Sequence, residues 1–170
     1  MQDDTFQGAA ELAGYLLADA VWRLDRDELF FPLIGHERDI QHDGDRAFAV
    51  LRSEAADVTI AVRHAEEWLD SNPERVARAA LVHDGFLTWE GVRREALYSR
   101  IVEYRRPRRS LDIVVPYSRT TGVLALHRPK LFRPVGLPEN LLPVVRAFYR
   151  GVDSHEEGSR CWTRSLDQSA

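Results

Sequence analysis

A chain of 170 residues, 44% of them hydrophobic and 29% charged, has the size and composition of one globular domain with a core of its own. Its net charge is −4, so the chain as a whole has no positive charge to attract nucleic acid or an anionic membrane. The one cysteine, Cys161, excludes an internal disulfide. The acidic start, and the charges within the apolar stretch 9–24, predict a soluble cytoplasmic protein with neither a signal peptide nor a membrane span.

Helical patterns dominate the first part of the chain. The first helix is predicted from about Phe6 to Leu24, and a buried connector or short strand follows at 30–35. After a polar loop at 35–45, Asp45 is placed to cap a long amphipathic helix that ends at 71–73. A strand at 58–62 is the alternative, because these residues are largely β-branched. The helix is favoured by an unbroken stripe of apolar residues spaced by three and four: Phe48, Leu51, Ala55, Val58, Val62, Ala65 and Leu69.

The central part of the chain alternates instead. Residues 79–83 and 111–117 are predicted strands, and the pairs at 84–85 and 121–122 are turn signals. The segment 94–105 fits either a helix or a strand. Its short connections to the neighbouring strands favour a strand in an antiparallel meander.

The end of the chain is helical again. Leu141, Val145, Phe148 and Val152 share one stripe, and Pro143 is expected to delay the start of this helix by a turn. Ser154 has the spacing of a capping residue for a last short helix. Helices, then a meander, then helices predict an α+β fold. We expect one domain over 1–170. The alternative for 153–170 is a terminal helix that is only loosely attached to it.

A His-Asp pair is the sharpest enzymatic motif, since signatures of P-loop, α/β-hydrolase and zincin chemistry are absent from the sequence. His83 and Asp84 follow a small apolar run, and this short segment resembles the core of the HD-type metal phosphohydrolases. The resemblance implies a metal that activates water, with His64 as a first ligand and Asp112 as a last one. The structural alternative is a strand that ends in a turn, where Asp84 bonds to local backbone.

Two other acidic groups are candidate metal sites. The first is a loop cluster, which a solvated loop with a helix cap also explains: His36, Glu37, Asp39, His42, Asp43 and Asp45. The second is Asp84, Glu103 and Arg105, a nuclease-like set in which arginine replaces the lysine and cannot act as a base.

Four arginines flank Pro107 in the predicted turn between two strands. This arginine tip, formed by Arg105, Arg106, Arg108 and Arg109, is a candidate site for phosphates or an acidic partner. The alternative is a solvated turn that discourages edge pairing.

The leading functional hypothesis is a non-catalytic binding or interaction domain, with the arginine tip as its partner-binding site. The regular apolar stripe of the long helix is a candidate surface for pairing with a second copy, although core burial explains it as well. This hypothesis predicts no cofactor and no membrane association, and nucleic acid is not the expected partner. The alternative is a metal-dependent phosphohydrolase that uses His83 and Asp84, so the sequence leaves open whether the protein is an enzyme.

Overall fold

The computed structural model describes residues 4–28, 30–38 and 48–166. Its element order confirms the α+β prediction, with helices before and after a central antiparallel sheet. None of the described helices is both long and apolar enough to cross a lipid bilayer. The elements are α1 (Asp4–Asp25), β1 (Leu33–Glu37), β2 (Ala49–Arg52), α2 (Val58–Ser71), β3 (Arg78–Trp89), β4 (Val92–Glu103), β5 (Arg109–Thr120), β6 (Val123–Leu126), β7 (Lys130–Val135), α3 (Leu142–Ser154) and α4 (Glu156–Ser165).

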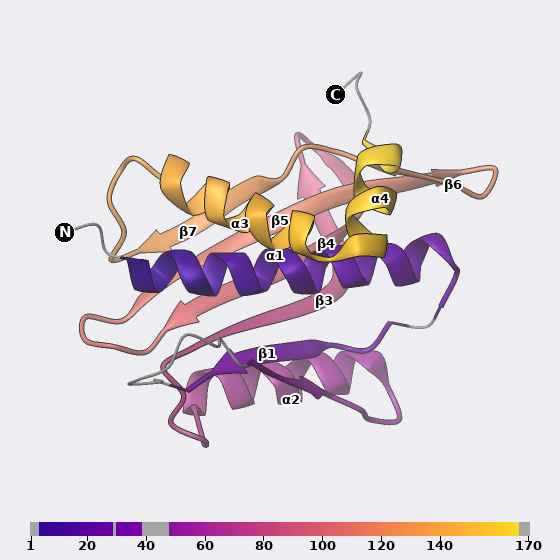
Figure 1. Cartoon of the computed structure of the whole chain (residues 1–170). Helices are drawn as coiled ribbons and strands as arrows, with labels where there is room; N and C mark the ends of the chain where they lie inside the picture. The colour runs from indigo at the N-terminus through magenta and orange to yellow at the C-terminus, as the bar shows by residue number, and fades with distance from the viewer. Residues whose placement is uncertain (1–3, 29, 39–47, 167–170) are drawn as a thin grey trace.

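In the described residues, seven strands form one antiparallel sheet in the order β2-β1-β3-β4-β5-β6 (Figure 1). The last strand, β7, also pairs with β5, so β6 and β7 share one side of that strand. The β3–β4 turn at Glu90 and Gly91, and the β5–β6 turn at Thr121 and Gly122, have positive φ at both central residues. This is the backbone that tight two-residue hairpins require.

Helices cover the two faces of the sheet unequally. On one face, α1 lies against the sheet with α3 and α4 packed on it, whereas α2 lies on the other face near β1 (Figure 1). Successive residues of β3 serve the two cores, since Ala80 and Val82 face α1 while Ala79 and Leu81 face α2. Because α2 is short, it covers only part of its face of the sheet, and no described helix covers the rest of that face.

Glycines allow α1 to approach α3 and α4 closely. A Cβ on Gly14 would lie 1.9 Å from the carbonyl oxygen of Phe148, and one on Gly151 would lie 1.8 Å from that of Glu11. A Cβ on Gly158 would lie 2.4 Å from the carbonyl oxygen of Ala18. Backbone atoms have little room to move aside, so these three positions require glycine.

Gly151→Ala is therefore expected to lower the free energy of unfolding by about 1–3 kcal/mol or more, because the added methyl group forces α1 and α3 apart. Urea unfolding followed by circular dichroism measures this change. Asp153→Ala, at an exposed position of the same helix, is the control and should stay within about 0.5 kcal/mol of wild type. Equal midpoints for Gly151→Ala and wild type would contradict the close packing.

The predicted long helix at 48–69 is wrong in its first half. Residues Ala49–Arg52 form β2 and pair with β1, and α2 begins only at Val58. Asp57 caps this helix, since its carboxylate accepts a hydrogen bond from Thr59 N–H at 2.6 Å. The other predicted cap, Asp45, lies outside the described residues.

Two further predicted boundaries are wrong, whereas the predictions for 94–105 and Pro143 are confirmed. Asp84 and Gly85 lie inside β3, which continues to Trp89. His155, not Ser154, caps α4 by accepting a hydrogen bond from Gly158 N–H. The segment 94–105 belongs largely to β4, and Pro143 lies in the first turn of α3.

Candidate functional site

The side of β3 that faces β1 is only partly paired. β1 has five residues and pairs with Arg78–Val82, whereas β3 has twelve residues and continues to Trp89. In the described part of the chain, no strand pairs with β3 on this side after Val82. We call this stretch, residues 83–89, the β3 edge.

Backbone polar groups of the β3 edge point alternately toward and away from β4. The carbonyl of Ala77 accepts a hydrogen bond from Tyr104 N–H, in register with the β3–β4 pairs. The backbone N–H and C=O groups of every second residue after Ala77 therefore point to β4. The residues between them point the other way, so the N–H and C=O groups of Asp84, Phe86 and Thr88 face outward beyond the end of β1.

Two side chains bond to carbonyls of the β3 edge. His83 donates from Nδ1 to the carbonyl of Asp84 at 2.9 Å, and the Tyr98 hydroxyl donates to the carbonyl of Phe86 at 2.8 Å. The two rings stack at 5.3 Å and 2°. A carbonyl oxygen has two lone pairs, so each can accept one more hydrogen bond. Among the described residues, none accepts from the N–H groups of Phe86 or Thr88 on the outward side.

A groove of about 480 Å³ lies along the β3 edge at residues 83–86. Its walls come from the end of α1, the loop after it and the first turns of α2. Phe86 is 56% exposed and Val58 is 38% exposed, which is high for apolar side chains lining a concave surface. The apolar lining residues are Leu24, Phe30, Val58, Val62 and Phe86.

The polar part of the groove is acidic. Its described lining includes Glu28, Asp84 and Glu95 and contains neither lysine nor arginine. The hydroxyl of Tyr117 donates to the Asp84 carboxylate, with distances of 3.0 and 3.1 Å to its two oxygens. Burial raises the pKa of Asp84, and the bonds from Tyr117 and Gly85 N–H oppose this only in part. Burial, with the nearby Asp84 charge, likewise raises the pKa of Tyr117.

A raised pKa makes the stability contribution of Asp84 depend on pH. The native chain holds this proton to a higher pH than the unfolded chain, so the contribution is lost as pH rises above the usual value of 3.8. Asp84→Asn should therefore gain stability relative to wild type as pH rises from about 4 to 7. Urea unfolding at several pH values measures the difference, with Glu139→Gln as an exposed control. A difference that does not change with pH would contradict this assignment.

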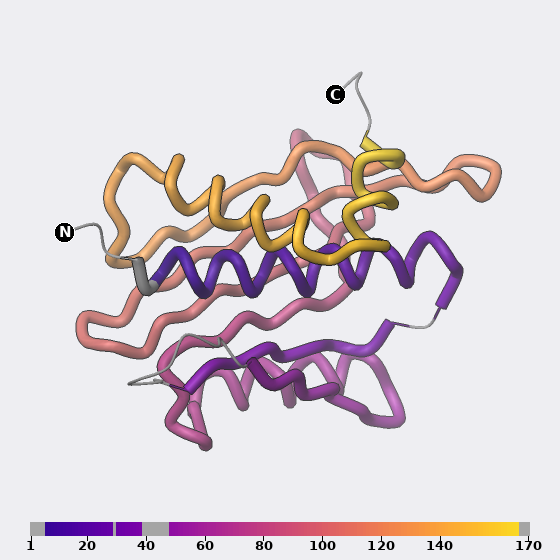
Figure 2. Tube along the Cα trace, viewed as in Figure 1, coloured from indigo at the N-terminus to yellow at the C-terminus, as the bar shows by residue number. Residues whose placement is uncertain are grey.

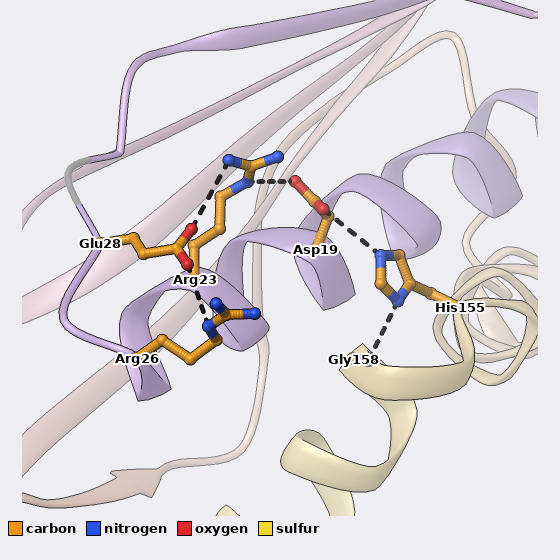
Figure 3. Close-up of polar contacts among 6 residues, drawn as sticks. All are labelled: Asp19, Arg23, Arg26, Glu28, His155 and Gly158. Atoms are coloured by element: carbon orange, nitrogen blue, oxygen red, sulfur yellow. Dashed lines mark hydrogen bonds and ion pairs between the residues drawn. The ribbon is translucent and has the colours of Figure 1, made fainter.

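A polar network fixes the wall of the groove that contains Glu28 (Figure 3). Its carboxylate lies 2.9 Å from Arg26 and 3.9 Å from Arg23, and Arg23 also binds Asp19 at 2.7 Å. His155 accepts from Gly158 N–H through Nδ1, so its Nε2 carries a proton and donates to Asp19 at 3.3 Å. The loop after α1 is thereby tied to the α3–α4 junction.

The structure does not bring the four predicted metal ligands together, although His83 and Asp112 line one small pocket beside Glu66 of α2. His83 and Asp84 point to opposite faces of β3, because they are consecutive residues of a strand. His64 is exposed on α2, and Asp112 binds Arg100 at 3.2 Å and Arg133 at 2.7 Å. In residues 4–28, 30–38 and 48–166, no three His, Cys, Asp or Glu side chains form a group that could hold a metal ion.

The arginine tip lies at the β4–β5 hairpin, which projects beyond α1 near its N-terminal end (Figure 2). Arg105 and Arg106 are exposed. Arg108 lies 3.4 Å from Asp70, and Arg109 forms an ion pair with Glu103, whose side chain is 2% exposed. Arg108 and Arg109, both predicted partner-binding residues, thus contact acids of their own chain.

Arg109→Ala is expected to destabilise the fold by about 3–5 kcal/mol, because it leaves the buried Glu103 carboxylate without its cation. Urea unfolding tests this, with the exposed Arg106→Ala as a control expected within about 0.5 kcal/mol of wild type. Combining Arg109→Met with Glu103→Leu should restore most of the loss, since no buried charge remains. If Arg109→Ala unfolds like wild type, the ion pair does not contribute as argued.

The other acidic candidates are separated in the fold. Asp84 pairs with Leu97 and Glu103 pairs with Arg78, so the two acids are six residue steps apart along β3, about 20 Å of strand. In the loop cluster, the structure describes His36 and Glu37, both buried in β1, and Glu37 binds Arg78. Asp39, His42, Asp43 and Asp45 lie outside the described residues.

Most residues of the groove were not predicted from the sequence. They come from the end of α1, the start of α2, β3 and β4, and no local motif joins these segments. One usable signal is that β3 is much longer than β1. Assigning Asp84 and Gly85 to a turn made β3 too short and concealed this difference. Comparisons with protein-family models, with curated proteins and with solved structures found no match to this chain.

Proposed function

We propose that this chain is a protein-interaction domain that binds an extended segment of a partner protein as an additional strand on the β3 edge. The observation that supports it is the coincidence of outward-facing backbone groups with a groove wide enough for side chains. In this binding mode, main-chain hydrogen bonds supply affinity and the groove contacts alternate side chains of the segment.

The partner site is placed in the groove because the arginine tip is already engaged in part. Arg108 and Arg109 pair with Asp70 and Glu103, so an acidic partner would compete with these contacts. The alternative function, a phosphohydrolase using His83 and Asp84, stays a prediction from the sequence. Metal analysis of the purified protein is its direct test.

Phe86→Pro is the sharpest test of strand addition. Phe86 N–H points away from β4, so proline removes an outward donor at an edge position, where proline is tolerated. Peptides of about twelve residues, long enough to span the edge, are selected from a random phage-displayed library on the full chain. Phe86→Pro should weaken the selected peptides by about tenfold or more, whereas Phe86→Ala, which keeps the N–H, should weaken them less.

Peptide N-methylation tests the same point without altering the protein. Methyl groups on alternate residues remove the donors of one peptide edge, so only one of the two methylation patterns should abolish binding. Equal binding to wild type and Phe86→Pro, or failure to select any peptide, would overturn the proposal. A wild-type dimer that Phe86→Pro converts to a monomer would identify a second copy as the occupant instead.

A further inference from the structure

Two carboxylates lie on the same face of the sheet in the groove. Glu95 pairs with Phe86 on one side and with Tyr117 on the other. Asp84 is two residues from Phe86 and so is a diagonal neighbour of Glu95, at a separation that long side chains can bridge. Burial is the main cause of the raised pKa of Tyr117, and the charges of Asp84 and Glu95 raise it further. The strand register therefore places the two acids as diagonal neighbours on one face of the sheet.

These two acids differ from Glu28 in their surroundings. Glu28 has ion pairs with Arg23 and Arg26, whereas no described residue forms an ion pair with Asp84 or Glu95. Arg93, which shares their face of the sheet, is engaged over the ring of Phe86 at 4.0 Å. Asp84 is half-buried and Glu95 is exposed. Two like charges close together repel, and a cation between them relieves that repulsion.

We infer that the groove selects a segment with a lysine or arginine whose charged group lies between Asp84 and Glu95. This inference rests on the proposed function, since the segment must first bind along the β3 edge. The exposed apolar side chain of Phe86 offers a surface for the aliphatic part of the cation's side chain. Charge-assisted hydrogen bonds to two carboxylates then discriminate a cation from a neutral side chain of similar size.

The test uses synthetic versions of one selected peptide, in which each position in turn is lysine, norleucine or glutamate. At one position, lysine should bind about tenfold tighter than norleucine, and glutamate should bind more weakly than either. Fluorescence anisotropy on the full chain measures the affinities. The lysine preference should fall with added salt, because Glu95 is exposed and its charge is screened.

Glu95→Gln should remove most of this preference while leaving norleucine binding within about twofold of wild type, because it deletes charge and keeps shape. Asp84→Asn should also lower the preference, because it removes the charge while its amide oxygen can still accept the hydrogen bond from Tyr117. Glu90→Gln, which removes one exposed charge at the β3–β4 turn, is the matched control and should keep the preference.

The outcomes separate the two proposals. Tight binding of lysine and norleucine peptides without preference would overturn the cation-selective position and leave strand addition standing. A preference that survives both Glu95→Gln and Asp84→Asn would show that the cation binds elsewhere. Failure to select any peptide that binds the full chain would overturn strand addition itself.

Discussion

Close contact between the backbones of α1, α3 and α4 determines where the rest of the molecule can lie. Gly14, Gly151 and Gly158 each have a main-chain carbonyl of another helix where a Cβ would stand. This packing holds α1 between the sheet and the C-terminal helices, and many of its residues are completely buried. The bond from His155 to Asp19 adds a polar contact at the same junction. Because α1 is fixed along its length, its last turn, with Leu24, forms one wall of the groove.

The groove exists because neighbouring strands differ in length. A long strand beside a short one leaves unpaired backbone groups, which proteins protect against uncontrolled pairing. Here the protection is partial. His83 and Tyr98 bond to two outward carbonyls and stack on each other, while α2 and the loop after α1 form the sides of a cavity above the strand. The proposed strand addition would use the part of the edge that these contacts leave open.

The sequence predicts elements whose pattern is set locally, and it fails where tertiary pairing decides. The alternation at 111–117 identified β5, and the stripe ending at Val152 identified α3. The spacing of Phe48, Leu51 and Ala55 is helical by coincidence, because the pairing of residues 49–52 with β1 overrides it. Asp57 was a better signal for the start of α2, because its side chain can cap a helix. The apolar stripe that begins at Phe48 was the more conspicuous pattern and concealed it.

The candidate site shows a similar limit. The sequence analysis treated His83 and Asp84 as one motif, but adjacency in a strand separates their side chains onto opposite faces. His83 therefore stacks on Tyr98 at the edge, and Asp84 lies in the groove and accepts a hydrogen bond from Tyr117. A motif defined by adjacent letters describes a shared site in a helix or a turn, whereas in a strand the informative neighbours are those across the sheet. Only the register of β3, β4 and β5 brings the two acids and the tyrosine together, and that register follows from hairpin turns at 90–91 and 104–108 rather than from the pair itself.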